Sequence, residues 1–337
     1  MVKDFSDAAA GTAMVKNVAK RGDRARFHRG ASFIVTRYDG QGGGVASGRA
    51  ELYIGGQSEG PRNNPRQILK GEETMKKPLW FVLLVSLLMP GLAMAQSAFD
   101  GTWKFDLKTA QFPKKPEVYV LQDGMYHCKT CVPTIDIIAD GQDQKLTGHP
   151  YYDTMSIKVV DDRTIAETAK KDGKTVVASK TWVSADGNTL MFEFTDSSAT
   201  NADPVTGKGE ETRVAKGPAG SHAISGSWRV TKIDSVSDNG LSFTYKVEGD
   251  SLTMTTPTGQ SYTAKLDGTE APYKGDPGTS SVSVKRLDKN TIEETDKRDG
   301  KVIAVARITV SADGKSMTVA VDDKLHGTSS QFVAVKQ

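Results

Sequence analysis

The stretch "DRTIAETAKKDGKTVVASKTWVSADG" (162–187) decides the fold, because the chain contains a second version of it. "KNTIEETDKRDGKVIAVARITVSADG" (289–314) aligns with it without gaps at an offset of 127 residues, and 13 of 26 positions are identical. The similarity extends outward, since "FDGTWKFDL" matches "ISGSWRVTKI" and "KLTGHPYY" matches "KLDGTEAPY". We therefore expect two tandem domains, residues 97–216 and 223–337, each long enough to fold alone. The join lies near "AKGPAGSHAIS", which is rich in small and breaker residues.

Both repeats are typical of all-β structure. Apolar and polar residues alternate with a period of two, as in antiparallel strands with one buried and one solvated face. Asp-Gly pairs at 172–173, 186–187, 299–300 and 313–314 predict tight hairpins, since Gly accepts the positive φ of such turns. A meander of eight or nine strands per repeat favours closure, so we predict two tandem antiparallel up-and-down β-barrels without a long helix. The expected inward residues include Leu190, Phe192 and Phe194 in one repeat and Met317, Val319 and Val321 in the other.

A family resemblance supports this prediction. Gly101-Thr102-Trp103 and Gly226-Ser227-Trp228 open the two repeats and resemble the G-x-W of the first strand in lipocalins and fatty-acid-binding-like proteins, the calycin superfamily. The stretch 126–165 is similar to uncharacterised exported bacterial proteins with lipocalin-like domains. The resemblance implies a lipocalin-like barrel in each repeat, with Trp103 and Trp228 plugging the closed ends; ordinary core tryptophans are the alternative. The Arg that packs on this Trp in lipocalins has no clear counterpart.

Residues 75–95, "MKKPLWFVLLVSLLMPGLAMA", indicate an export signal. Lys76 and Lys77 precede an apolar run, and small residues at Ala93 and Ala95 fit signal-peptidase cleavage before Gln96. The run is shorter than the ~20 residues of a membrane span, which disfavours the alternative of a signal-anchor helix. The mature chain is therefore expected in the periplasm or outside the cell, and its oligomeric state is left open.

Residues 1–74 have a different composition from the repeats and lack sustained apolar periodicity. "KGEET" before Met75 can be encoded by a purine-rich ribosome-binding sequence, so we interpret 1–74 as a mis-called, disordered upstream extension rather than a nucleic-acid-binding arm. The chain carries a net charge of +3, of which 1–74 contribute +4 and Lys76 and Lys77 +2, leaving −3 for 96–337. We therefore expect neither a nucleic-acid partner nor a membrane span in the mature chain.

Cys128 and Cys131 are the only cysteines. A local disulfide suits an oxidising compartment. A redox dithiol is an alternative, although no βαβ pattern surrounds the motif. A metal site is another, but it would need two further ligands. His149 is a candidate, whereas His127 adjoins Cys128 and would point to the other face of a strand. We expect no metal and no cofactor.

The two repeats differ in one aligned strand. Hydroxyls occur in the set Thr175, Val177, Ser179, Thr181 and Val183, whereas Val302, Ala304, Ala306, Ile308 and Val310 are all apolar. If this set faces inward, one barrel has a more polar interior; the alternative places Val176, Ala178 and Trp182 inside. We predict Ser179, Thr181 and Phe192 as ligand-binding residues.

The motifs G-x-S-x-G, H-E-x-x-H and G-x-x-x-x-G-K-[ST] are absent from the sequence. Two function classes lead. One is an exported lipocalin-like protein that holds a small apolar or amphipathic ligand inside a barrel. The other is a non-catalytic envelope or extracellular interaction protein with filled barrels. An enzyme ranks behind both, and no catalytic residue is predicted.

Overall fold

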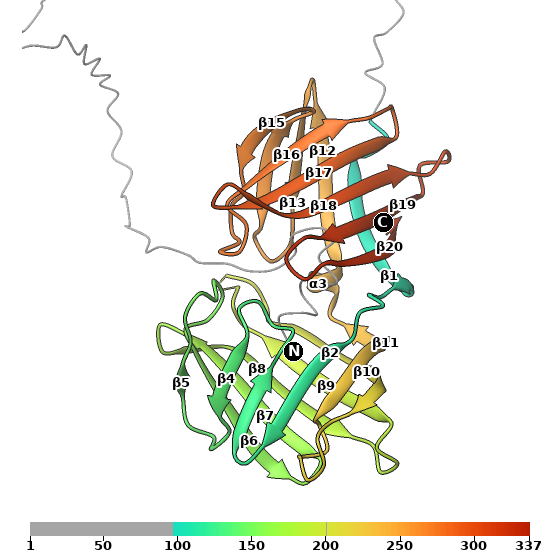
Figure 1. Ribbon diagram of the computed structural model, residues 1–337. Helices are drawn as coiled ribbons and strands as arrows, with labels where there is room; N and C mark the ends of the chain where they lie inside the picture. Colours follow the sequence, from blue (N-terminus) through green and yellow to red (C-terminus); the bar gives the residue numbers. More distant parts are fainter. Residues whose placement is uncertain (1–96, 200) are drawn as a thin grey trace, which may run out of the picture. The chain divides into compact units, whose positions relative to one another are not determined.

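The computed structural model describes residues 97–199 and 201–337. The predicted upstream extension and signal peptide lie outside these residues. Within the described part of the chain, no helix has the length and apolar character needed to cross a bilayer. Twenty antiparallel strands form two nearly closed sheets of ten strands each (Figure 1), which confirms the all-β class and the pair of barrels. Each barrel has ten strands, one or two more than the eight or nine expected.

The first barrel consists of β2 to β11, in the order β4-β3-β2-β11-β10-β9-β8-β7-β6-β5. Its strands are β2 (Glu117–Gln122), β3 (Met125–Cys128), β4 (Ile135–Ile138), β5 (Gln144–Lys145), β6 (Thr154–Asp161), β7 (Thr164–Lys171), β8 (Lys174–Val183), β9 (Thr189–Asp196), β10 (Val205–Lys216) and β11 (Gly226–Val236).

The second barrel consists of β1 and β12 to β20, in the order β14-β13-β12-β1-β20-β19-β18-β17-β16-β15. One helical turn, α3 (Asp238–Leu241), precedes β12. The strands are β1 (Gly101–Gln111), β12 (Ser242–Glu248), β13 (Ser251–Thr255), β14 (Ser261–Lys265), β15 (Asp267–Pro272), β16 (Ser281–Arg286), β17 (Thr291–Arg298), β18 (Lys301–Val310), β19 (Ser316–Asp323) and β20 (Thr328–Lys336).

The barrels exchange their opening strands, so the sheets do not follow the expected boundaries of 97–216 and 223–337. Strand β1 of the first repeat pairs with β12 and β20 of the second, and Figure 1 shows it in cyan among orange and red strands. Strand β11 of the second repeat pairs with β2 and β10 of the first. The first barrel is therefore one continuous segment, 117–236, and the second barrel is assembled from both sides of it.

Strand β1 is followed by a linker and does not fold back onto β2. This linker, "FPKKP", contains Pro113 and Pro116, which fix φ and lack an N–H donor. The two junctions are equivalent in detail. The amide of Val247 donates to Asp100 Oδ1 (2.6 Å) beside β1, and the amide of Leu121 donates to Ser225 Oγ (2.8 Å) beside β11. Each G-x-W strand thus docks in the same way onto the other repeat.

Trp103 and Trp228 are fully buried at equivalent positions, but each lies in the barrel of the other repeat. Their indole N–H groups donate to Phe99 O and Ile224 O, both at 2.8 Å. A cation covers each ring. The Arg213 guanidinium lies 3.8 Å from the Trp228 ring centroid, and Lys336 Nζ lies 5.1 Å from that of Trp103.

The backbone conformation explains why each G-x-W motif begins with glycine. Gly101 and Gly226 adopt φ of +127° and +144°, which side-chain-bearing residues rarely reach. A Cβ at Gly226 would also lie 2.7 Å from Arg213 Nη1, and one at Gly101 would lie 2.7 Å from Lys336 Cε. The motif therefore makes space for the cation that covers the tryptophan.

The predicted inward faces are largely confirmed. Leu190, Phe192, Met317, Val319 and Val321 are buried, whereas Phe194 is only partly buried. On β8 and β18 the set that includes Thr181 and Ile308 faces the core. Ala178 and Trp182 do not, whereas Val176 is half-buried and packs against the core of the first barrel. The first members, Thr175 and Val302, are exposed because a register shift lies at the start of each hairpin.

The β7–β8 and β17–β18 hairpins turn at the predicted Asp-Gly pairs. Asp172 and Asp299 both have φ of 50°, and Gly173 and Gly300 have φ of 74° and 78°. Two consecutive positive φ values are the requirement of a type I′ turn. These turns fix the register that places equivalent residues of β7 and β17 inside the two barrels.

Candidate functional site

The three predicted ligand residues lie together inside the first barrel. Thr181 on β8 pairs directly with Phe192 on β9, and Ser179 lies two residues away on the same strand. Thr181 and Phe192 are buried and Ser179 is half-buried. The sequence pattern therefore grouped these side chains correctly. Whether they bind a ligand remains a prediction.

The two hydroxyls already have a protein partner. Ser179 Oγ donates to Glu167 Oε2 at 2.8 Å, and Thr181 Oγ1 donates to the same oxygen at 3.4 Å. Glu167 lies on the adjacent strand β7 and is only 4% exposed. Hydrogen bonding is what makes a buried carboxylate tolerable. The extra hydroxyls of the first barrel therefore solvate a carboxylate of the fold.

Aromatic rings occupy the space beside these hydroxyls. A Cβ at Gly207 would come within 2.5 Å of the Phe194 ring, and one at Gly209 within 2.6 Å of the Phe192 ring. Both glycines are buried on β10, directly paired with the two phenylalanines on β9. The two rings therefore occupy the space that a Cβ at either glycine would need.

The equivalent carboxyl in the second barrel, Glu294, has different partners. It occupies the position of Glu167 at the repeat offset, but its neighbours on β18 are Ala306 and Ile308 in place of hydroxyls. Glu294 is fully buried. Its Oε2 accepts hydrogen bonds from the phenol of Tyr262 on β14 and, at 3.5 Å, from Tyr245 on β12. The carboxyl is therefore held by phenols of β12 and β14, two strands that do not pair with β17.

A second acid follows on the same face of β17. Asp296 is 5% exposed, two residues after Glu294, where the first repeat has Ala169. Tyr273, whose ring centroid lies 5.6 Å from that of Tyr262, adds a third buried phenol. We call Glu294, Asp296, Tyr245, Tyr262 and Tyr273 the acid–tyrosine cluster.

Burial controls the protonation of this cluster. Desolvation raises the pKa of Glu294 to about 7, against the opposing effect of the two phenol hydrogen bonds. Burial, together with the charges of Glu294 and Asp276, raises the pKa of Asp296 well above its ordinary value. Burial also raises the pKa of all three tyrosines, so their hydroxyls remain donors. Near neutral pH the two acids hold at least one proton between them.

Two oxygens of the cluster are buried without a partner. They are Glu294 Oε1 and Asp296 Oδ1. The directly paired residues on β16 and β18 are all apolar: Val282, Val284, Ala304 and Ala306. Within the described ranges, no Lys, Arg or His forms an ion pair with either acid. Buried oxygens without partners are uncommon in native proteins and mark this cluster as a candidate site.

The cysteine pair forms the expected disulfide, with 2.06 Å between the sulfurs of Cys128 and Cys131. His127 Nδ1 lies 2.5 Å from Asp136 Oδ1, and the ring of His149 stacks on Tyr152 with centroids 5.0 Å apart. Both histidines considered as metal ligands therefore contact other side chains.

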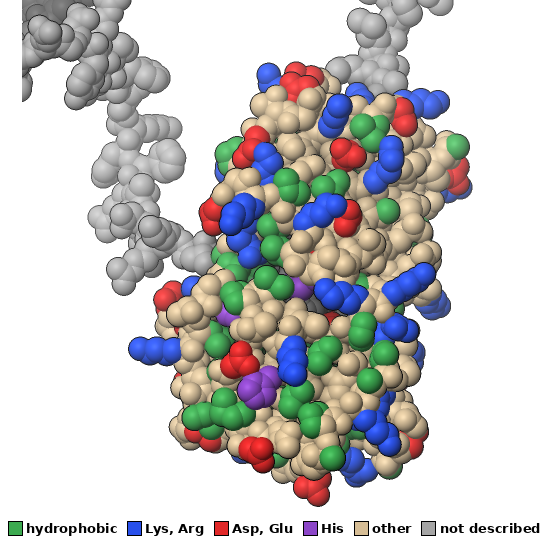
Figure 2. Space-filling model, viewed as in Figure 1, with side chains coloured by type: hydrophobic (Ala, Val, Ile, Leu, Met, Phe, Trp, Pro, Cys, Tyr) green, Lys and Arg blue, Asp and Glu red, His purple; other side chains and the backbone are tan. Residues whose placement is uncertain are grey.

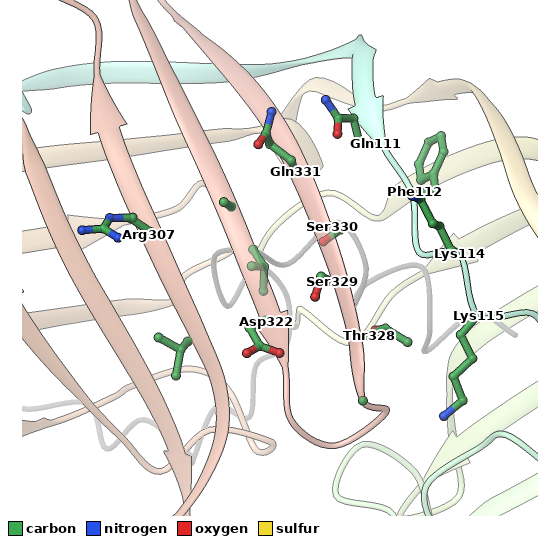
Figure 3. A pocket seen from close by; sticks show the side chains of 14 residues that line it. Gln111, Phe112, Lys114, Lys115, Arg307, Asp322, Thr328, Ser329, Ser330 and Gln331 are labelled. Atoms are coloured by element: carbon green, nitrogen blue, oxygen red, sulfur yellow. The ribbon is translucent and has the colours of Figure 1, made fainter.

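Two grooves lie on the outer faces of the barrels at equivalent positions. The larger, of about 730 Å³, runs over β18, β19 and β20 and the linker after β1, and Figure 3 shows its polar lining. The smaller, of about 400 Å³, lies over β8, β9 and β10. Lys180 and Arg307 occupy the same position in the two grooves at the repeat offset. On the face shown in Figure 2, basic and acidic side chains are interspersed.

The acid–tyrosine cluster was not predicted, although part of its pattern is visible in the sequence. In "TIEETDKR" (291–298), Ile292, Glu294 and Asp296 alternate with Glu293 and Thr295, so a strand must bury both acids if it buries Ile292. The tyrosines come from distant strands, and no local pattern connects them to β17. No protein-family model matches the chain, and no curated protein matches it in sequence.

Proposed function

We propose that the chain is an exported, lipocalin-like binding protein that holds a small amphipathic ligand in the second barrel. The observation that carries this proposal is the acid–tyrosine cluster, with two fully desolvated carboxyl oxygens that lack a partner. Polar groups placed in an otherwise apolar interior are the usual way for a barrel to orient a ligand. The apolar wall around the cluster, with Phe243, Leu252 and Val284 among its residues, would contact the apolar part.

The first barrel is the weaker candidate because its polar groups serve the fold. Ser179 and Thr181 donate to Glu167, and Phe192 packs against Gly209. A ligand there would have to displace these contacts. The ligand role predicted for the three residues is therefore less well supported than a role for Glu294 and Asp296.

Native mass spectrometry of protein purified from its own host tests this function. We expect a mass adduct that denaturation releases, and a melting temperature that falls once the adduct has been removed. The variant Glu294→Gln should lose the adduct, whereas the equivalent substitution Glu167→Gln should keep it. An adduct that depends on Glu167 and not on Glu294 would move the site to the first barrel.

Export is part of the proposal and rests on residues 75–95 and the disulfide, which suits an oxidising compartment. N-terminal sequencing of the native protein should give Gln96. A stable native product that begins at Met1 would contradict this start of the mature chain.

The alternative function is a non-catalytic interaction protein. The two equivalent outer grooves favour it, because both repeats keep a hollow with a central cation, Lys180 or Arg307. A partner that binds there should be lost in the double variant Lys180→Glu and Arg307→Glu, and retained in Glu294→Gln. The reverse pattern, with loss only in Glu294→Gln, supports the ligand function.

A further inference from the structure

We propose that the polar end of the ligand is an organic cation, an ammonium group bound between the Glu294 and Asp296 carboxyls and the tyrosine rings. This inference rests on the proposed function and adds the chemical class of the ligand. It follows from what the acid–tyrosine cluster lacks and from where the cluster lies in the sheet.

The cluster gathers acidic groups and, among the described residues, has no basic side chain in an ion pair with either acid. Two acids and three phenols face one another, and Asp276 contributes a further negative charge near Asp296 and Tyr273. The residues paired with the two acids on β16 and β18 are Val or Ala. An ion in a low-dielectric interior is stable only when a counter-ion or several hydrogen bonds compensate it. A bound ammonium would supply the charge and donate to both unpartnered oxygens.

The aromatic rings suit the same group. Tyr245, Tyr262 and Tyr273 are all within the buried core around the carboxyls. A cation over a tyrosine face is attracted by the ring, and the attraction is larger in a desolvated site. An anionic ligand would instead meet like charge and phenol oxygens that already donate to Glu294. A neutral ligand with a single hydroxyl could donate to only one of the two oxygens, Glu294 Oε1 or Asp296 Oδ1.

The cluster also adjoins the discontinuity of the second sheet. The sheet order begins with β14 and ends with β15, so the barrel is not closed by a ladder there. Ser261 and Lys274 bridge this seam through two backbone hydrogen bonds of 3.0 and 2.8 Å. Tyr262 follows Ser261 and Tyr273 precedes Lys274. A ligand that enters at the seam therefore meets two of the three phenols first.

Isothermal titration calorimetry of the full chain with octylammonium, octanol and octanoate tests the charge preference at equal alkyl length. We expect octylammonium to bind saturably at one site, at least tenfold more tightly than octanol, and octanoate not to bind. If octanol or octanoate binds as well as octylammonium, the cation inference is wrong and the proposed function survives. If no probe binds, both fail.

Variants localise the effect. Asp296→Asn and Tyr262→Phe should each reduce octylammonium affinity by tenfold or more, and should leave octanol affinity within about threefold. Glu167→Gln, the matched control in the first barrel, should change neither. Asp296→Asn and Tyr262→Phe keep the side-chain shape, and circular dichroism would show that they fold. Unchanged octylammonium affinity in both folded variants would contradict the proposed position.

Proton release gives a readout on the wild-type chain. Octylammonium stays charged between pH 6 and pH 8, whereas Glu294, with a pKa of about 7, must give up its proton to bind it. The groups near Glu294 are Tyr245, Tyr262, Tyr273 and Asp296, and Asp276 lies near Asp296 and Tyr273; none of these groups is cationic. Affinity should rise about tenfold from pH 6 to pH 8, with proton release visible as a buffer-dependent enthalpy. A pH-independent affinity would argue against carboxyl contact.

Discussion

Glu167 of the first barrel and Glu294 of the second barrel occupy the same position of the repeat and have different surroundings. Glu167 receives hydroxyl hydrogen bonds from the next strand, β8. Glu294 lacks these hydroxyls, receives phenols from β12 and β14, and has a second acid beside it at Asp296. The same arrangement of strands can therefore hold a buried carboxyl in two ways. Its oxygens can accept hydrogen bonds from neighbouring hydroxyls, or one of them can remain available to another molecule.

The largest effect should come from the tryptophans, which test whether the strands are exchanged. Trp228→Ala removes a fully buried ring and its hydrogen bond to Ile224, and should destabilise the chain by about 3–5 kcal/mol. Because Trp228 lies in the first barrel, hydrogen–deuterium exchange should rise in 117–236. Trp103→Ala should instead raise exchange in the strands from β12 to β20. The opposite assignment would mean that each repeat keeps its own first strand.

Glu294 should make the protein less stable as pH rises, whereas an ordinary carboxyl with a lowered pKa makes a protein more stable as pH rises. The folded state holds this proton up to a pKa of about 7 and the unfolded state only to about 4.5, so stability is greatest below pH 4.5 and is lost as pH rises to 7. The loss due to this group is about 3 kcal/mol. Urea unfolding at several pH values should show it in the wild type and not in Glu294→Gln. If the free energy of unfolding changes equally with pH in the two proteins, Glu294 is solvated in the folded state.

The disulfide should matter less than either of these groups. It closes a loop of only a few residues between Cys128 and Cys131, so chain-entropy arguments give about 2 kcal/mol at most. Reduction, or substitution of both cysteines by Ser, should lower the stability of the first barrel by this amount and leave exchange in the second barrel unchanged. Loss of the whole fold on reduction would contradict this estimate.

The smallest effect should be that of Thr181→Val. This change removes one long hydrogen bond to Glu167 and keeps the shape of the side chain, so it should cost about 0.5–1.5 kcal/mol. Ligand binding should not change, in contrast to Asp296→Asn in the second barrel. A ligand affinity that falls with Thr181→Val would restore the first barrel as the binding site.

The class of fold followed from local signals. Alternation on β9 and β19, and the Asp-Gly turns at 172–173 and 299–300, determine strands, hairpins and inward faces, because each depends on a few neighbouring residues. The strand with which the first strand of a repeat pairs does not depend on neighbouring residues in this way. Gly101 and Gly226 open nearly identical motifs, so either strand fits either barrel, and no local signal decides between them.

The candidate site was harder to predict for the same reason. Ser179 and Thr181 were placed correctly inside a barrel from their alternation alone, but their use by Glu167 depends on the pairing of β7 with β8. Likewise, Arg213 covers Trp228 from the strand that precedes the second repeat, and no spacing within one motif indicates that contact.

The exchange of strands changes what a break in the chain would do. A protease that cuts at the exposed segment 217–221 would separate the two repeats covalently, yet each fragment would keep a strand inside the barrel of the other. The fragments should stay together in solution and co-purify. Produced separately, each would lack one strand of its barrel until it met its complement. The duplicated halves of this protein have thereby become mutually dependent, as two subunits of an obligate heterodimer would be.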